Sequence, residues 1–472
     1  MIFNSFEFLW LFPIIFCLYY LVISRKEFTE KWPKIGNILL LVISYGLYLK
    51  WKPVYGLVLF GITAITYYFA LLIEKKKAFG QKRYIIFLGI TLALLPLIIF
   101  KYYNFLNEQL IILLRSIGIE IGLSGLNWSM PLGISFFTLQ AIGYLADVYL
   151  QRIKAEHHFG DYMLFVSFFP QIASGPISKA KDLLPQIKAQ RSFNYNQAVQ
   201  GLKWLLWGMF LKVVVADRLG MRVDNFYLTY HSSGGFDCFI VSLLYTFQIY
   251  CDFAGYSFMA LGVGEVLGFE LINNFNRPYF SQSITEFWHR WHISLSTWLK
   301  DYIYIPLGGS RCSKANNYWN IFVTFLVSGL WHGANWTFIV WGLLHGIFQI
   351  IEKIFGLNKL KSHGIIKFAR ICFTVLLVNF AWIFFRMPTF EDAFQYVQRI
   401  FTNFSGNILQ FMGALAYIAI VLSKDLIDEY KIKTLSLFHH KNTIIRWATY
   451  LILLFIIAID GVFGGQFIYS GF

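Results

Sequence analysis

Long apolar runs separated by short polar loops make up most of this chain. A helix that crosses a bilayer needs about 17–25 predominantly apolar residues, and a sequence with many such runs predicts an all-α polytopic membrane protein. We expect spanning helices near 8–24, 36–50, 54–73, 84–100, 131–150, 198–216, 236–260, 319–333, 336–352, 366–385, 408–423 and 446–464. No linker or internal repeat divides the pattern, so we expect a single membrane domain over residues 1–472.

Three segments do not fit a simple span. Residues 101–130 mix apolar and polar positions, and we expect them to lie along the outer interface. Residues 161–176 are too short to cross and are interrupted by proline and glycine, and residues 286–307 are aromatic but carry several charges. Irregular or charged segments at membrane depth persist only when they are buried in protein or line a water-filled cavity. These segments therefore predict re-entrant structure and an internal chamber that opens toward the cytoplasm.

Composition supports the membrane assignment. Hydrophobic residues make up 57% of the chain and charged residues only 14%, whereas soluble domains contain about 25% charged residues. The five cysteines show no paired spacing and mostly lie in apolar runs, which argues against a disulfide framework or a zinc site. They are Cys17, Cys238, Cys251, Cys312 and Cys372.

The distribution of basic residues predicts one orientation. The formal net charge of +15 could indicate nucleic-acid binding, but the basic residues lie in short loops, the usual sign of loops that face the cytoplasm. Placing loops 25–34 and 75–83 in the cytoplasm puts the N-terminus outside. The same alternation places 151–160, 177–193, 269–315, 353–367 and 424–444 inside. The first run lacks a cleavage site, and we expect it to be retained as a span.

The strongest candidate for chemistry is His332, in the segment SGLWHGANWTFIVWGLLHG at 328–346. An ionisable group within an apolar helix is costly and is a functional candidate, and histidine moves protons near neutral pH. The alternative is a core histidine that hydrogen-bonds to a neighbouring helix. For His345, thirteen residues further on, this structural interpretation fits better.

A second candidate region is RPYFSQSITEFWHRWHISLSTWLKDYIYIPLGGSR at 277–311. If 286–301 is helical, His289 and His292 lie on one face, a spacing that could bind a metal, but no third ligand follows. We therefore expect no metal. The simpler hypothesis is that His292 lines the same chamber as His332, with His289 nearer the cytoplasmic surface.

Several charged residues have two interpretations. The basic side chains of this region could hold the phosphates of an anionic donor, or could simply mark the cytoplasmic side; they are Arg277, Arg290, Lys300 and Arg311. Asp147 and Asp252 could orient a histidine or an arginine, or form plain interfacial pairs. Cys251 is a conceivable nucleophile, although nothing beside it in the sequence is arranged to activate it. Phosphate-loop, GxGxxG and HExxH motifs are absent.

Seven ordered motifs resemble the membrane-bound O-acyltransferase (MBOAT) family, and within it the alginate O-acetyltransferase branch. They are PLGISFFTLQAIGYLADVY (131–149), FFPQIASGPI (168–177), GLKWLLWGMFLKVVVADRL (201–219), FQIYCDFAGYS (247–257), NFNRPYF (274–280), FWHRWHISLSTWLKDYIYIPLGG (287–309) and SGLWHGANWTFIVWGLLHG (328–346). The motif core spans about 100–350. The resemblance implies a helical bundle around a central tunnel, with an acyl-CoA donor entering from the cytoplasm and an acceptor from the other side.

The resemblance also implies roles for individual residues. His332 corresponds to the family's catalytic histidine, and His292 corresponds to a histidine with a supporting role. We expect substrate binding by Arg277, Arg290, Trp331, Asn335 and Arg311. One position departs from the family pattern, because Phe258 stands in GYSFMA where similar sequences usually have an acid, which leaves any role of that acid in doubt.

The expected function is O-acyl transfer, most simply O-acetyl transfer, from cytoplasmic acetyl-CoA or another acyl-CoA to an extracytoplasmic hydroxyl for polysaccharide O-acetylation. The acceptor would be a polysaccharide or a partner protein outside a bacterial-type cell membrane, and no tightly bound cofactor or nucleic acid is expected. One alternative is D-alanyl transfer from a carrier protein to teichoic acid. A proton-coupled transporter would show paired broken spans in its two halves, and no such repeat is present.

Overall fold

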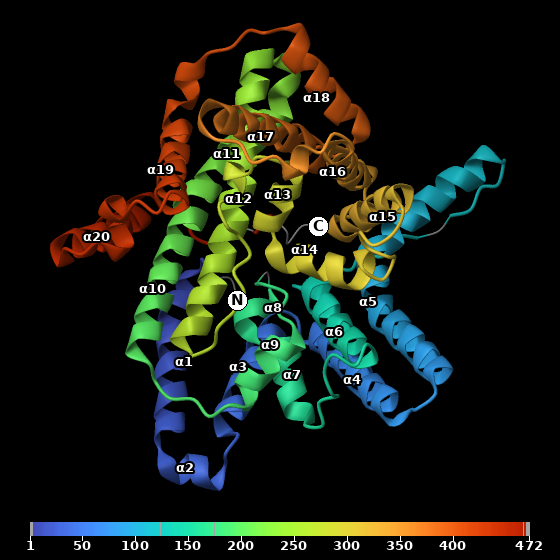
Figure 1. Ribbon diagram of the computed structural model, residues 1–472, viewed down its shortest axis with the longest axis vertical. Helices are drawn as coiled ribbons and strands as arrows, with labels where there is room; N and C mark the ends of the chain where they lie inside the picture. Colours follow the sequence, from blue (N-terminus) through green and yellow to red (C-terminus); the bar gives the residue numbers. More distant parts are fainter. Residues whose placement is uncertain (1–2, 123, 174, 466, 469–472) are drawn as a thin grey trace.

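The computed structural model describes residues 3–122, 124–173, 175–465 and 467–468, and its regular structure there is helical throughout (Figure 1). The gap at 174 falls within the segment that is expected to be re-entrant. The α-helices are α1 (Phe6–Ser24), α2 (Lys26–Lys31), α3 (Ile35–Trp51), α4 (Pro53–Lys75), α5 (Phe79–Ser116), α6 (Ile134–Tyr149), α7 (Phe159–Ser167), α8 (Phe169–Ile172), α9 (Ala180–Lys188), α10 (Tyr195–Met209), α11 (Asp217–Thr229), α12 (Gly235–Val266), α13 (Ile284–Arg290), α14 (Ile293–Leu299), α15 (Lys314–His332), α16 (Trp336–Ile354), α17 (Gly364–Arg386), α18 (Phe390–Thr402), α19 (Met412–Glu429) and α20 (Thr443–Asp460). Short π-helices follow α10 at Phe210–Ala216 and α14 at Lys300–Tyr304.

Most of the expected spans correspond to long apolar helices, which makes this a multi-pass membrane protein. In the described part of the chain, nine helical segments are long and apolar enough to cross a bilayer. The expected spans at 36–50, 131–150 and 319–333 correspond to α3, α6 and α15, which are not among them. These three helices are shorter or more polar, and α6 is buried along nearly its whole length, so protein rather than lipid surrounds it.

The three irregular segments behave differently from one another. Residues 101–116 continue α5, which runs unbroken to Ser116, and their position along the outer interface stays a prediction. Residues 161–176 form the short helices α7 and α8, as the interruptions predicted. Residues 286–307 do not form one helix, because the helical conformation is interrupted between α13 and α14.

The centre of the bundle is formed by α6 and α12, whose side chains are buried on almost every face. Helix α10 packs along α12, and the hairpin of α15 and α16 packs beside α17. Helices α5 and α20 project from opposite sides of the bundle (Figure 1). Their outward side chains are apolar, which is the pattern that contact with lipid requires.

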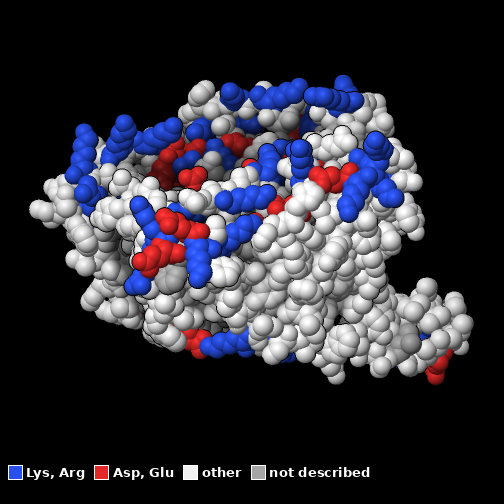
Figure 2. Space-filling view, turned by 90° about the horizontal axis from the view of Figure 1, so that it is seen from below, with Lys and Arg blue, Asp and Glu red and all other residues white. Residues whose placement is uncertain are grey.

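Charge gathers on one face of the molecule. Figure 2 shows Lys and Arg along this basic face, with a broad band that carries few charges beside it and a few charges beyond that band. The band has the character of a surface immersed in hydrocarbon, and the basic face has the character of a cytoplasmic surface.

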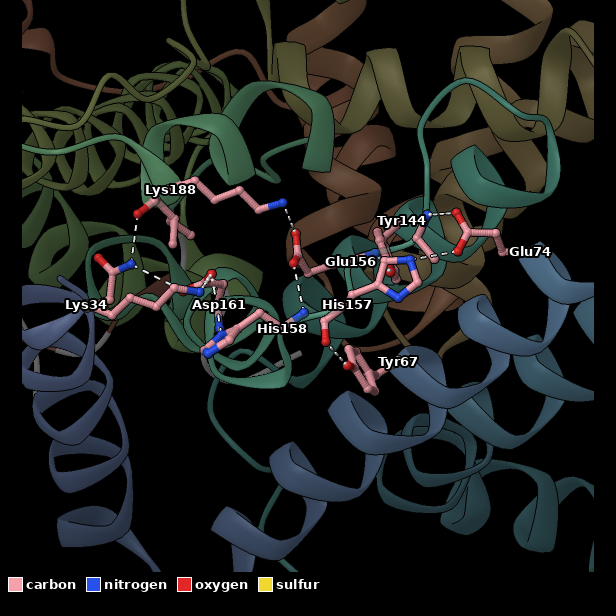
Figure 3. Close-up of polar contacts among 12 residues, drawn as sticks. Lys34, Tyr67, Glu74, Tyr144, Glu156, His157, His158, Asp161 and Lys188 are labelled. Atoms are coloured by element: carbon pink, nitrogen blue, oxygen red, sulfur yellow. Dashed lines mark hydrogen bonds and ion pairs between the residues drawn. The ribbon is translucent and has the colours of Figure 1, made fainter. Parts of the chain in front are cut away.

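Ion pairs fix the loop before α7 on the basic face. Lys34 Nζ lies 2.7 Å from Asp161 Oδ2, and Lys188 Nζ lies 2.5 Å from Glu156 Oε2 (Figure 3). The Tyr67 hydroxyl donates to the carbonyl of His157 at 2.6 Å. Both carboxylates are buried, so the paired lysines neutralise charges that burial alone would disfavour. These contacts tie α3, α4, α7 and α9 together below the centre of the bundle.

Candidate active site

His332 is positioned by the hairpin of α15 and α16. The two helices approach closely where Gly329 and Gly342 meet, because a Cβ at Gly329 would lie 2.5 Å from the carbonyl oxygen of Phe338 and one at Gly342 would lie 2.4 Å from that of Phe325. Asn335 begins α16 by accepting a hydrogen bond from the Thr337 amide at 3.0 Å. The turn between the helices is therefore tight, and it holds the end of α15 in place.

His332 is the last residue of α15 and is 1% exposed. Its ring lies 4.8 Å from Trp331, 4.7 Å from Trp341 and 5.4 Å from Phe385, measured between ring centroids. His292, His345 and the ammonium of Lys101 are close enough to interact with it electrostatically. The imidazole thus lies in an aromatic cage with few other polar neighbours.

His292 reaches the same aromatic cage from a different element. It lies at the break between α13 and α14 and is fully buried. Its ring is 4.6 Å from Phe253 and 6.0 Å from Trp331. Because Trp331 also contacts His332, one indole joins the two histidines, and their opening into a shared chamber stays a prediction.

The break at His292 also corrects the helical interpretation of this region. His292 has φ 42° and ψ 55°, in the left-handed region, where a non-glycine residue is strained. The loop before α13 fixes this geometry: the Ile293 amide donates to the Asn274 carbonyl at 3.0 Å, and the Ser294 amide donates to Asn274 Oδ1 at 3.1 Å. His289 is exposed, so the two histidines do not share a helix face.

Several buried polar atoms around the two histidines lack a hydrogen-bond partner among the described residues. They are Nδ1 and Nε2 of His292, Oγ of Ser328, Nε1 of Trp331 and Nε1 of Trp341. Buried polar groups in proteins are ordinarily paired. Their concentration beside His332 is the expected condition of a chamber whose remaining partners come from a substrate or from water.

A cavity of about 490 Å³ lies at the end of α15 that carries His332. It is lined by Phe100, Lys101, Trp128, Met130, Gly333, Ala334, Asn335, Thr337, Phe338, Phe385, Arg386, Met387 and Pro388. Gly333 directly follows His332, and Phe385 contacts its ring. We call this the outer cavity, because α15 begins near the basic face and ends here.

A second cavity, of about 270 Å³, lies between the outer cavity and the basic face. It is lined by Thr285, Trp288, His289, Ile293, Ser296, Thr297, Leu299, Lys300, Tyr304, Ile321, Thr324, Phe325, Gln349 and Lys353. We call it the inner cavity. Thr324 precedes His332 by eight residues on α15, or roughly 12 Å at 1.5 Å per residue. Trp288 lines this cavity and its ring lies 5.7 Å from Trp341, which contacts His332.

Comparisons with known proteins agree with this geometry. The family model of the membrane-bound O-acyltransferases matches residues 148–385. This chain belongs to the membrane-bound O-acyltransferase family. The matched residues include both histidines and the break between α13 and α14, so the resemblance recognised in the motifs is confirmed.

Similar proteins of this family carry the names of acyl-transfer enzymes. The chain is 38% identical over 405 residues to a probable alginate O-acetylase AlgI from Pseudomonas aeruginosa, covering 85% of this chain and 75% of that protein. It is 35% identical over 420 residues to a peptidoglycan O-acetyltransferase from Helicobacter pylori, covering 83% and 78%. A teichoic acid D-alanyltransferase from Streptococcus thermophilus is 30% identical over 277 residues, covering 56% and 66%. The chain is therefore an acyltransferase.

In this acyltransferase, two of the arginines expected to bind substrate have carboxylate partners. Arg277 Nε lies 2.9 Å from Glu429 Oε2, and Arg290 forms a two-point contact with the same carboxylate at 2.9 and 3.1 Å. Burial lowers the pKa of the Arg290 guanidinium, but hydrogen bonds and charges from Glu429 and Glu286 outweigh burial and raise that pKa above its ordinary value. Both side chains bind carboxylates in this structure, and their binding of a phosphate stays a prediction.

The other residues expected to bind substrate lie in different places. Trp331 is buried between Lys101 and His292, whereas Asn335 caps α16 and lines the outer cavity. Arg311 is exposed on the loop before α15. The MBOAT motifs thus gather Trp331 and Asn335 around His332, while Arg311 lies at the basic face.

The remaining sequence candidates have structural partners instead. His345 accepts from Trp288 Nε1 at 3.3 Å, which agrees with a core histidine. Asp252 pairs with the buried Lys212 at 2.6 Å, and Asp147 pairs with Arg152 at 3.2 Å.

Two further expectations concern metals and the family pattern. No group of three His, Cys, Asp or Glu side chains suited to a metal was found in the described residues. Phe258, where similar sequences carry an acid, stacks on Trp204 with ring centroids 5.0 Å apart. An aromatic contact between α10 and α12 therefore stands at the position of that acid.

Sequence reasoning missed two residues of α5. Lys101 and Tyr102 donate hydrogen bonds to the backbone at the end of α15. In the sequence, Lys101 directly follows the apolar run at 84–100 and falls in the segment 101–130, which is expected along the outer interface. The signal that could have identified it is its isolation, because no other charged residue lies between Arg83 and Glu108.

Proposed function

We propose that this acyltransferase is an O-acetyltransferase that moves an acetyl group from acetyl-CoA at the basic face to a hydroxyl at the opposite face, for O-acetylation of a cell-surface polysaccharide. The observation that carries the proposal is the arrangement of the two cavities. The outer cavity lies at the turn of the hairpin of α15 and α16, and the inner cavity lies toward the other end of the hairpin, roughly 12 Å from His332 along α15. In this proposal the donor enters through the inner cavity, the acceptor enters through the outer cavity, and both meet at the His332 imidazole.

The chemistry follows from an imidazole beside two substrates. His332 accepts the proton of the acceptor hydroxyl while its oxygen attacks the thioester carbonyl. The tetrahedral intermediate then collapses, the carbon–sulfur bond breaks, and the proton passes from the imidazolium to the leaving thiolate. The products are an acetyl ester and free coenzyme A. General-base assistance of this kind is typically worth about 10²–10⁴-fold.

His292 supports this reaction from the opposite side of Trp331. Its ring nitrogens have no protein partner among the described residues, so a protonated ring nitrogen is available to the carbonyl oxygen of the donor. A hydrogen bond there stabilises the negative charge of the tetrahedral intermediate. The basic residues at the face of the inner cavity, such as Lys300 and Lys353, would attract the phosphates of the donor.

The acceptor belongs to the surface polysaccharides. The similar proteins carry the names alginate O-acetylase and peptidoglycan O-acetyltransferase, so the shared chemistry is esterification of a sugar hydroxyl. Transfer runs directly to the sugar or through a partner protein outside the membrane. In this proposal the protein lies in a bacterial-type cell membrane with the basic face in the cytoplasm and the N-terminus outside.

The test uses acetyl-CoA labelled in its acetyl group and membrane vesicles that contain the full chain. We expect label to pass to polysaccharide with the wild-type chain and not with His332→Ala. In cells, mass spectrometry of the surface polysaccharide should lose O-acetyl groups when the gene is removed. Transfer of D-alanine from a phosphopantetheine carrier protein, with no transfer from acetyl-CoA, would replace this proposal with the teichoic acid alternative.

A further inference from the structure

The outer half of α5 contacts the last turn of α15. Lys101 Nζ donates to the carbonyl oxygen of Trp331 at 2.6 Å and to that of His332 at 2.9 Å. The hydroxyl of Tyr102 donates to the carbonyl of Leu330. Two consecutive residues of one helix therefore bind three consecutive carbonyls of another, and the last of these belongs to His332.

These carbonyls are the ones that a helix cannot satisfy itself. The last four carbonyl groups of an α-helix have no partner within it, and they form the negative end of the helix dipole. Trp331 and His332 are buried, whereas Leu330 is exposed, so water does not replace the missing donors fully at the last two carbonyls. A lysine ammonium supplies both the hydrogen bonds and the complementary charge.

The environment of Lys101 contains no other explanation for a charge at this depth. A lysine inside a membrane is costly and usually has a partner, yet no carboxylate lies within ion-pair distance of Lys101 in the described ranges of the chain. Its ammonium lies 5.7 Å from the ring centre of Trp331 and borders the outer cavity. In the described residues, the hydrogen bonds and the cation–π contact of Lys101 are thus all with the segment that carries His332.

The same helix also holds the other side of the turn. Trp336 Nε1 donates to Gln109 Oε1 at 3.1 Å, and the Trp336 ring lies 5.8 Å from Phe105. Trp336 is the first residue of α16. Helix α5 therefore contacts the hairpin both before and after its turn, which fixes the turn as a unit.

We propose that Lys101, assisted by Tyr102, is a positioning residue that clamps the end of α15 and holds the His332 imidazole between the two cavities. This inference rests on the proposed function of His332. Its catalytic consequence is geometric, since a displacement of about 1 Å at a reacting group can lower a rate about 10²-fold. Lys101 acts on the reaction through the backbone of His332 and takes no proton from the substrate.

The test compares matched variants of α5 in the full chain, with acetyl-CoA as the donor. For Lys101→Met we expect kcat to fall about 10–10²-fold while the KM for acetyl-CoA stays within about twofold, because the misplaced group acts in the transition state. Lys101→Arg retains a cation with several donors and should recover most of kcat. Tyr102→Phe removes one of the three hydrogen bonds to α15 and should lower kcat less than Lys101→Met does.

A control and a second measurement separate positioning from folding. Lys82→Met makes the same substitution at the start of α5, far along the helix from α15, and should leave kcat unchanged. Rates are given per folded protein, measured as the monodisperse fraction in detergent. If Lys101→Met does not accumulate, the clamp is tested with Tyr102→Phe and Lys101→Arg instead. Wild-type kcat for Tyr102→Phe together with an inactive Lys101→Arg would overturn the clamp.

Other outcomes distinguish this inference from the function on which it rests. Wild-type kcat in Lys101→Met, with His332→Ala inactive, overturns the clamp and leaves the proposed function standing. A raised KM with unchanged kcat makes Lys101 a substrate-binding residue and also overturns the clamp. Wild-type-like activity in His332→Ala overturns the proposed function itself.

Discussion

At the scale of single residues, the conformation of His292 is the most informative feature. A left-handed backbone costs an L-residue about 1–2 kcal/mol, and such strain persists only where the surroundings impose it. Here Asn274 imposes it through two backbone hydrogen bonds beyond the break, and the result is an imidazole in contact with Trp331. The fold therefore sacrifices some stability to bring His292 beside His332.

Substitutions of the two histidines test two different roles in the reaction. His332→Ala should lower kcat about 10²–10⁴-fold, because it removes the general base. His292→Gly should lower kcat about 10²-fold through loss of a hydrogen-bond donor, and glycine's fit to a left-handed backbone should offset part of the stability lost with the buried ring. The measurement is acetyl-CoA-dependent acyl transfer per folded protein.

The control for both variants is His363→Ala, an exposed histidine in the loop before α17. It should keep the wild-type rate. A His292→Gly variant with the wild-type rate would exclude His292 from the reaction and would leave only the structural contacts of its ring.

At the scale of elements, the hairpin of α15 and α16 decides where His332 lies. Its tightness depends on backbone contact at Gly329 and Gly342, where a methyl group would meet the carbonyl oxygen of Phe338 or Phe325. Small residues allow this approach between helices in membranes. Helix α5 then holds the turn of the hairpin, so three helices together define the position of one imidazole.

The hairpin makes a prediction with a matched control. In Gly342→Ala the new Cβ would lie 2.4 Å from the carbonyl oxygen of Phe325. Overpacking of this kind typically costs about 1–3 kcal/mol. We expect a lower melting temperature in detergent and a lower kcat, since α15 must move. Gly413→Ala on α19 meets no atom within 4 Å and should be neutral or slightly stabilising, because alanine favours helix by up to about 1 kcal/mol. Equal melting temperatures for the two variants would contradict this account of the hairpin.

At the scale of the whole molecule, the charge distribution and the cavities agree on one direction of transfer. Lys and Arg gather on one face (Figure 2), and the inner cavity lies toward that face while the outer cavity lies beyond His332. In the proposed function, an anionic donor is attracted to the basic face, and an acceptor outside the cell meets the opposite face. The bilayer would then separate the two substrates, and the protein would join them at one buried site.

Orientation is tested by cysteine accessibility. In a chain without its five native cysteines, Lys76→Cys follows α4 on the proposed cytoplasmic side, and Asn403→Cys follows α18 on the proposed outer side. A maleimide that cannot cross membranes should label Asn403→Cys in intact cells, and Lys76→Cys only after the cells are broken. The reverse pattern would invert the direction of transfer.

The sequence by itself determined the class of the fold and predicted the principal histidine. Hydropathy fixes which segments enter the bilayer, since burying a polar backbone in lipid requires helices, and loop charge predicts their orientation. The ordered motifs singled out His332 and His292. Each of these features depends on residues that are close together in the sequence, so a local pattern of residues is sufficient to predict it.

Only the tertiary structure decided how the site is assembled. The break at His292 depends on Asn274, a residue eighteen positions away, and helical periodicity predicted an unbroken face instead. Contacts between distant parts of the chain also pair Arg277 and Arg290 with the Glu429 carboxylate. They bring Lys101 to the end of α15 from more than two hundred residues away in the sequence. A buried polar group takes whichever partner the packing of distant helices brings within hydrogen-bond distance, and the order of residues along the chain does not specify that partner.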